Sequence, residues 1–251
     1  MKRSSYLIRV YRVTRIVMHF LYAGAIIFLL YRWLPQRLRW RIERRWSNGF
    51  LSILNIQVRV HGDVPDMFSQ NVMLVSNHVS WLDIYLLASV HPVKFVSKAE
   101  VRSWPVIGWL AHKTGTLFID RTKRHDTARI NNEIASVLCK GGCLAVFPEG
   151  TTSDGGRLRP FHASLLQPAI HSQSQLWPAA IRYRHADGSI NTAAAYVDEL
   201  TFADSFRLVL GQSIIYAELE FLSPIAAHGK TRRELARETE VLIASALNLQ
   251  E

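Results

Sequence analysis

Segments typical of buried strands alternate with segments typical of helices along most of this chain. The strand-like segments are residues 56–61, 72–75, 94–97, 115–119, 143–147, 176–183 and 213–221. The helix-like segments are residues 84–90, 103–113, 125–140, 163–172 and 230–247. Strands separated by helices usually lie parallel, because each helix carries the chain back across the sheet. The pattern predicts an α/β fold with a mostly parallel central sheet flanked by helices.

An uncharged apolar stretch, residues 16–31, precedes this region. Sixteen helical residues extend for ~24 Å, which is short of the ~30 Å hydrocarbon core of a bilayer. Eleven lysines and arginines crowd its two ends, with Trp33, Trp40 and Trp46 among those that follow. We expect residues 1–50 to form membrane-anchoring helices, whose arginines contact anionic headgroups. A buried core helix fits such basic flanks less well, and no cleavage site of a signal peptide follows the stretch.

The charge of the chain points to anionic partners. Thirty Lys and Arg residues against twenty Asp and Glu give a formal net charge of +10 among 251 residues. Basic residues beside an apolar stretch suit anionic lipid better than nucleic acid, and we find no nucleic-acid-binding motif, so we expect no nucleic-acid partner. The two cysteines, Cys139 and Cys143, are expected to be reduced thiols. No neighbouring ligands complete a metal site, and we assign no metal.

His78 and Asp83 form a candidate pair of a base and the carboxylate that orients it. They are five residues apart, so on one continuous helix they would lie about 140° apart and could not touch. The sequence places His78 after a strand and Ser80 at the start of a helix, with Asp83 in its first turn. This bend would turn the carboxylate back toward the imidazole. The spacing alone is weak, because a surface histidine beside a capping aspartate is the commoner arrangement.

Two further polar segments follow strands. Residues 147–156 form a glycine-rich loop that includes Glu149, Gly150, Thr151, Thr152 and Ser153. Arg121 follows another strand and could hold a phosphate through charge-assisted hydrogen bonds. Either segment alone would more often be an ordinary surface feature. Ligands gather at the carboxyl ends of strands in open α/β sheets, and their shared placement there with His78 is the stronger signal.

Four ordered motifs resemble the blocks of the glycerolipid acyltransferase family. They are Asn77-His-Val-Ser-Trp-Leu-Asp83, Gly115-Thr-Leu-Phe-Ile-Asp-Arg121, Phe147-Pro-Glu-Gly-Thr151 and Trp177-Pro-Ala-Ala-Ile181. The resemblance covers about residues 55–225, and the four motifs in this order are highly specific together. It implies that residues 51–251 form an acyltransferase catalytic domain that follows a helical membrane anchor.

The resemblance also implies roles for these residues. His78 would be the catalytic base and Asp83 its partner, and the acyl acceptor would be held by Arg121, Glu149, Gly150, Thr151, Thr152 and Ser153. The enzyme would need no metal or bound cofactor and would use acyl-CoA or acyl-carrier protein as donor. It would work with membrane lipids at the cytoplasmic face of the bacterial inner membrane. The expected reaction acylates a lysophospholipid, first of all 1-acyl-sn-glycerol-3-phosphate, to give phosphatidic acid.

One departure from the family pattern concerns the acceptor. Thr152 stands where phosphatidate-forming members commonly have an arginine, which weakens the case for a phosphate headgroup. Arg157 and Arg159 could compensate. The sequence of this loop also resembles that of relatives that acylate lyso-ornithine lipid. Acylation of lyso-ornithine lipid is therefore the close alternative. A non-enzymatic protein that binds anionic lipid would explain residues 1–46 equally well, but it would leave His78, Asp83 and the 147–153 loop without a role.

Overall fold

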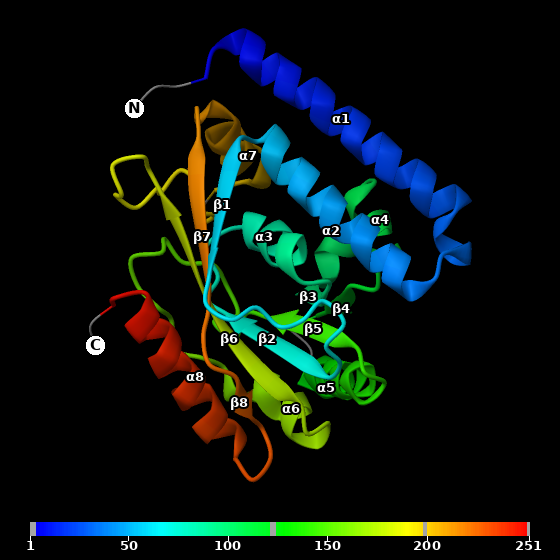
Figure 1. Ribbon diagram of the computed structural model, residues 1–251, viewed down its shortest axis with the longest axis vertical. Helices are drawn as coiled ribbons and strands as arrows, with labels where there is room; N and C mark the ends of the chain where they lie inside the picture. The colour runs from blue at the N-terminus through cyan, green and yellow to red at the C-terminus, as the bar shows by residue number, and fades with distance from the viewer. Residues whose placement is uncertain (1–3, 121–123, 198–199, 250–251) are drawn as a thin grey trace.

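The computed structural model describes residues 4–120, 124–197 and 200–249 as a central sheet with helices on both faces (Figure 1). The strands are β1 (Ile56–His61), β2 (Val72–Ser76), β3 (Lys94–Lys98), β4 (Leu117–Ile119), β5 (Cys143–Val146), β6 (Gln175–Arg184), β7 (Ile215–Phe221) and β8 (Ile225–Ala226). The helices are α1 (Tyr6–Leu29), α2 (Gln36–Ile53), α3 (Leu82–Val90), α4 (Ile107–Lys113), α5 (Arg124–Cys139), α6 (Gln167–His171), α7 (Phe202–Gly211) and α8 (Arg232–Ala246). Short 3-10 turns cover Tyr31–Trp33, Ala99–Ser103 and Ala163–Leu166.

The sheet is mostly parallel, as the sequence predicts. Its strand order is β1-β7-β6-β2-β5-β3-β4, and β8 pairs with β6. Five neighbouring pairs are parallel, whereas β6 runs antiparallel to β7 and β8. The strands β7 and β8 pair with successive parts of β6, β7 with residues 179–184 and β8 with residues 175–176. The parallel strands β2, β5 and β6 form the centre, where β2 delivers the chain to the candidate site.

Alternate side chains of the strands build one apolar core on each face of the sheet. On β2, Val72 and Leu74 belong to the core under α2, α3 and α7, while Met73 and Val75 belong to the core under α5, α6 and α8. A strand buried on both faces needs such a continuous apolar run. The site loops that follow β2 and β5 therefore begin from rigid supports.

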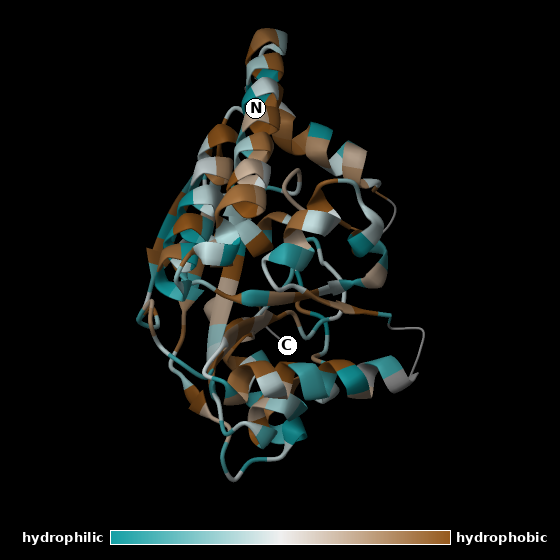
Figure 2. Cartoon of the chain, turned by 90° about the vertical axis from the view of Figure 1, so that its right-hand side faces the viewer, coloured by the Kyte–Doolittle hydropathy of each residue, from teal (hydrophilic) through white to brown (hydrophobic). Residues whose placement is uncertain are grey.

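The N-terminal helix is longer than the apolar stretch suggests. Twenty-four residues, Tyr6–Leu29, are helical, which corresponds to ~36 Å. It is the one helix among the described residues that is long and apolar enough to cross a membrane. Much of its apolar surface is exposed, including Leu7, Met18 and Phe28. The cartoon in Figure 2 is coloured by hydropathy and shows hydrophobic residues on the helices of this part of the chain. The chain thus carries a helix suited to membrane association.

The expectation that the flanking arginines contact headgroups is wrong for Arg12. This side chain is 6% exposed, and its guanidinium donates to the carbonyls of Leu210 (3.2 Å), Gln212 (2.7 Å) and Ser213 (3.1 Å) at the end of α7. A cation there also complements the partial negative charge of the helix terminus. Arg12 therefore fastens α1 to the globular part.

Helix α2 lies antiparallel to α1 and joins it to the sheet (Figure 1). His19 of α1 stacks on Trp46, with ring centroids 5.1 Å apart, and one of its ring nitrogens lies 2.9 Å from the Trp46 carbonyl oxygen. At its other end α2 buries Phe50 and Leu51 in the core. The expected division between residues 50 and 51 falls inside this helix.

Three local expectations differ from the structure. The helix expected at residues 103–113 begins only at Ile107, because Pro105 interrupts it and leaves a 3-10 turn before it. Helix α3 begins at Leu82 rather than directly after Ser80, although Ser80 Oγ still accepts from the Leu82 amide at 3.3 Å. Helix α7 was not expected, yet Thr201 caps its start by accepting from the Asp204 amide.

Candidate active site

The site forms where β2 ends. Asn77 directly follows the strand and is 2% exposed, and its side chain makes two hydrogen bonds to one residue of β6. Its Nδ2 donates to the Ile181 carbonyl (3.0 Å), and its Oδ1 accepts from the Ile181 amide (2.8 Å). These bonds replace strand pairing just past the end of β2. They fix the backbone from which His78 projects.

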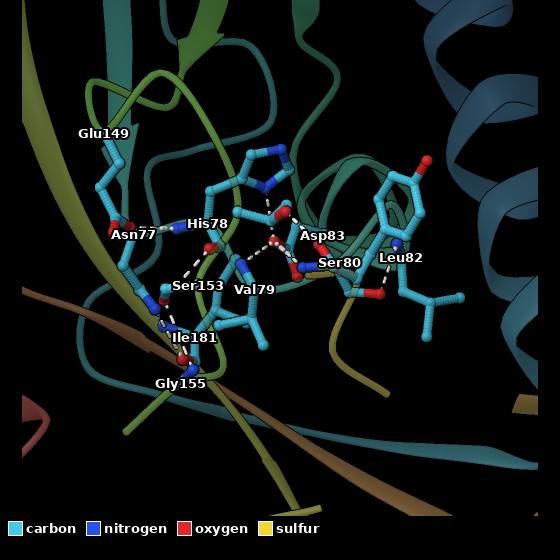
Figure 3. A network of polar contacts seen from close by, with 12 residues as sticks. Asn77, His78, Val79, Ser80, Leu82, Asp83, Glu149, Ser153, Gly155 and Ile181 are labelled. Carbon is cyan, nitrogen blue, oxygen red and sulfur yellow. Dashed lines mark hydrogen bonds and ion pairs between the residues drawn. The ribbon is translucent and has the colours of Figure 1, made fainter. Parts of the chain in front are cut away.

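His78 and Asp83 face one another, as the sequence predicts. His78 Nδ1 lies 2.8 Å from Asp83 Oδ2, and the other ring nitrogen points away from the carboxylate (Figure 3). Asp83 is fully buried, while the imidazole is 19% exposed. Because the carboxylate oxygen accepts, this contact places the proton on Nδ1, which donates to Asp83. The lone pair is then on Nε2, which points away from the carboxylate.

Asp83 accepts hydrogen bonds from three donors in addition to the imidazole. Its Oδ2 also accepts from the backbone amides of Val79 (2.8 Å) and Ser80 (2.9 Å), and its Oδ1 accepts from the Tyr183 hydroxyl (2.7 Å). Burial, and then the neighbouring carboxylate, raises the pKa of Tyr183 well above its usual value, so the phenol keeps the proton it donates. Four donors compensate for the loss of hydration of this buried carboxylate.

The loop after β5 supports the histidine rather than standing apart from it. The Phe147 ring stacks on the His78 ring, with centroids 4.0 Å apart and planes 10° apart. Glu149 accepts from the backbone amide of His78 (2.7 Å) with one oxygen and from that of Arg159 (2.9 Å) with the other. Both carboxylate oxygens are thus directed at the protein backbone, and Glu149 ties the two site loops together.

Burial raises the pKa of the Glu149 carboxyl to about 7, although the amides of Arg159 and His78 act in the opposite direction. The nearby Asp83 charge adds to the rise. Glu149 therefore titrates close to neutral pH. Its ionised form is the one that can accept from both backbone amides.

The other predicted loop residues lie in the same place but differ in what they contact. Thr152 is buried and its hydroxyl donates to the Tyr196 carbonyl, while Ser153 is buried and its amide donates to the His78 carbonyl at 2.8 Å. Gly150, with a φ of 75°, and Thr151 are partly exposed at the turn. Arg121 lies outside the described residues. Glu149 and Ser153 thus hold the backbone of His78, and Thr152 holds that of Tyr196. The predicted role of these loop residues in holding the acceptor stays a prediction.

Comparison with known proteins connects this geometry to an activity. Residues 56–182 match the family described as Acyltransferase, and this range contains every described residue of the site except Tyr183 and Tyr196. The chain belongs to this family. It is 41% identical to the lyso-ornithine lipid O-acyltransferase of Pseudomonas aeruginosa, over 84% of this chain and 80% of that protein. It is 37% identical to the 1-acyl-sn-glycerol-3-phosphate acyltransferase of Neisseria meningitidis, over 61% of this chain and 59% of that protein.

A solved structure shows the same fold. This chain superposes on the crystal structure of the 1-acyl-sn-glycerophosphate acyltransferase of Thermotoga maritima with a TM-score of 0.75. The match covers 96% of this chain and 94% of that one, at 19% sequence identity. This likeness shows the shared fold, and the family and the named relatives make the chain an acyltransferase of lipid biosynthesis.

Sequence reasoning missed two supports of the site and gave Asn77 no role. Tyr183 is 100 residues from Asp83, and Ile181 is 104 residues from Asn77. No local spacing indicates such pairs. The sequence offers two weaker signals: a tyrosine near the end of a strand, and an asparagine directly after a mostly apolar strand.

Among the described residues there is no group of three or more His, Cys, Asp or Glu side chains placed to hold a metal ion. Both cysteines are free thiols; Cys143 is buried and Cys139 is exposed.

Proposed function

We propose that the acyltransferase transfers a fatty acyl group from a thioester donor to the hydroxyl of a lysolipid, with His78 as general base and Asp83 as its orienting partner. The observation that carries the proposal is the imidazole held at Nδ1 by a buried carboxylate with three further donors. Such a carboxylate fixes the tautomer and stabilises the imidazolium that forms when Nε2 takes a proton.

The chemistry follows from this arrangement. The lysolipid hydroxyl gives its proton to His78 Nε2 while its oxygen attacks the thioester carbonyl carbon. The resulting tetrahedral oxyanion collapses, the C–S bond breaks, and the departing thiolate takes the proton back from the imidazolium. The products are an ester and a free thiol, and His78 returns to its neutral form. The whole cycle needs only one proton carrier.

An apolar pocket that reaches the first turn of α3 is suited to the acyl chain. It lies between α1, α2, α3 and α4, and its walls include Phe20, Ile26, Trp46, Tyr85, Ala88 and Leu110. It also contacts Ile84, the residue next to Asp83 in α3. We assign this apolar pocket to the fatty acyl chain, because burying each methylene there contributes about 0.8 kcal/mol.

Lyso-ornithine lipid gains support as the acceptor from the structure around Thr152. Phosphatidate-forming members commonly have an arginine at this position. Here the residue is Thr152, which is buried and whose hydroxyl donates to the Tyr196 carbonyl. The relative that matches 84% of this chain bears a lyso-ornithine name. The lysophosphatidate acceptor is supported by the Neisseria relative and by Arg157, an exposed cation in the same loop.

We further propose acyl-CoA or acyl-carrier protein as the donor, because both are anionic and the chain carries a formal net charge of +10. The cytoplasmic face of the inner membrane is the proposed location, since both donors are cytoplasmic and α1 offers an exposed apolar surface.

One experiment tests donor and acceptor together. The full chain, purified in detergent and reconstituted, is incubated with acyl-CoA or acyl-carrier protein and a panel that contains lysophosphatidic acid and lyso-ornithine lipid, and products are identified by mass spectrometry. The proposal predicts an O-acylated product from at least one acceptor. Absence of any acylated lipid from folded protein with every donor and acceptor would refute it.

A further inference from the structure

A second pocket, here called the cationic pocket, lies at the edge of the sheet opposite the site. Five cations from four segments surround it: Arg37 and Arg39 of α2, Lys94 at the start of β3, Lys113 at the end of α4, and Lys140 just after α5. Glu43 is the one acidic residue among its described walls. Four elements that are far apart in sequence therefore converge their positive charge on one hollow.

Among the described residues, the lysines of this pocket make no close ion pair, although Glu43 lies near enough for the charges of Lys94 and Arg39 to act on it and lower its pKa. Within the described parts of the chain, no carboxylate lies within 4.0 Å of the ammonium groups of Lys94, Lys113 or Lys140. Glu43 hydrogen-bonds to the Tyr31 hydroxyl, and burial raises its pKa to about 7, so the carboxyl carries only part of a negative charge at neutral pH. A hollow with excess positive charge concentrates anions.

The cationic pocket adjoins the apolar pocket. Five residues line both: Tyr31, Glu43, Val93, Lys94 and Thr114. Lys94 is half-buried and is the one lysine at this junction, while Lys113 and Lys140 are exposed further out. An apolar interior that leads to a cationic opening complements a ligand with a hydrocarbon chain and an anionic end group.

The anionic end of such a ligand would lie far from the reacting atoms. Cys143, in the wall of the cationic pocket, pairs with Val72 at the start of β2, and His78 lies six residues further along. At ~3.3 Å per residue of extended chain, this separation is ~20 Å. A group held by Lys94 is therefore not a reactant, although its chain would occupy the pocket assigned above to the acyl group.

We propose that the two adjoining pockets bind a free long-chain fatty acid, with the chain in the apolar pocket and the carboxylate at Lys94, supported by Lys113 and Lys140. The acid binds in the orientation opposite to that of the donor's acyl chain, with its carboxylate at the end of the pocket far from His78. It therefore competes with the donor for the apolar pocket. A single chain with a compact carboxylate fits a junction that offers one lysine. Such an acid is also the product when water instead of a lysolipid hydroxyl attacks the thioester, so the site would restrain the enzyme when acceptor is scarce.

Competition with the donor rests on the proposed function, but binding of the acid does not. Binding is therefore measured on full-length His78→Ala protein, which separates it from turnover. Radiolabelled palmitate is titrated into the detergent-solubilised protein, in parallel with hexadecanol, which has the same chain and no charge. Two double variants test the cations: Lys94→Met with Lys113→Met, and Lys113→Met with Lys140→Met, the second pair altering only exposed residues. Arg233→Met, an exposed cation on α8 across the sheet, is the matched control.

The proposal predicts that palmitate binds at least tenfold more weakly to both double variants than to the Arg233→Met control, because a charge-assisted contact is lost in each. Hexadecanol should bind all of them equally. In active wild-type protein, palmitate should raise the KM for the donor and leave kcat unchanged. Unaltered palmitate binding in both double variants would overturn the proposal. So would displacement of palmitate by inorganic phosphate at equal concentration, which would identify the hollow as a phosphate site.

Discussion

Replacing Asp83 by asparagine separates the charge of this residue from its shape. In the wild-type protein Oδ2 accepts from three donors, His78, Val79 and Ser80, and Oδ1 accepts from the Tyr183 hydroxyl. An asparagine can place its one oxygen toward the three donors and its amide nitrogen toward the Tyr183 oxygen, because a hydroxyl accepts as well as donates. The imidazole should therefore stay in place while the negative charge is lost.

The magnitude follows from the 2.8 Å contact between His78 Nδ1 and Asp83 Oδ2. An opposite charge at this range typically stabilises an ion by about 1.4–4 kcal/mol, and the imidazolium forms only as the proton is transferred. We expect kcat/KM of Asp83→Asn to fall about 10- to 1000-fold. The Tyr183 proton loses its acceptor, so the free energy of unfolding should fall by about 1–3 kcal/mol.

The assay measures kcat and KM for acyl transfer by the reconstituted variant and follows its thermal unfolding. Tyr183→Phe is the matched control, because it removes the same hydrogen bond and keeps the carboxylate. It should lose a similar amount of stability but much less activity. Near-wild-type kcat/KM in folded Asp83→Asn protein, or equal losses of activity in the two variants, would refute the reasoning.

Three further predictions follow from the supports of the site. Asn77→Ala leaves a buried amide and a buried carbonyl of β6 without partners, and denaturant titration should show a loss of about 2–5 kcal/mol in the free energy of unfolding. Arg12→Met should lower the melting temperature because α1 loses its hold on α7, whereas Arg15→Met, on the exposed side, should have little effect. Burial raises the pKa of Glu43 and Glu149 from 4.5 to about 7, so the folded state binds more protons than the unfolded state between these values. Stability should therefore contain a component that falls as pH rises from about 4.5 to about 7, and the double Gln variant should lose it.

The fold and the contact between His78 and Asp83 could be predicted because their signals are local. A strand of apolar residues followed by His78, and a helix start with Asp83 in its first turn, indicate a bend that brings the two together, and the structure has this bend. The apolar runs of β2 and β5 likewise indicate strands covered on both faces. In these segments local propensity and tertiary packing agree, which is why sequence reasoning succeeds there.

The rest depended on contacts between distant segments. Nothing near Arg12 distinguishes it from the exposed arginines around it, and only the position of the α7 terminus gives it a buried role. Glu149 has the sequence context of a ligand-binding carboxylate, yet both of its oxygens accept from backbone amides. Such roles are set by which backbone donors lie unsatisfied nearby, and that is a property of the assembled fold.

The claim on which the account depends most is that His78 Nε2 accepts the proton of the acceptor hydroxyl. The direct test compares the acyl-transfer rate of reconstituted His78→Ala protein with that of wild type and of His61→Ala, an exposed histidine at the end of β1. The account predicts a loss on the order of 10²- to 10⁴-fold for His78→Ala and an unchanged rate for His61→Ala. A folded His78→Ala enzyme that retains nearly the full rate would contradict it.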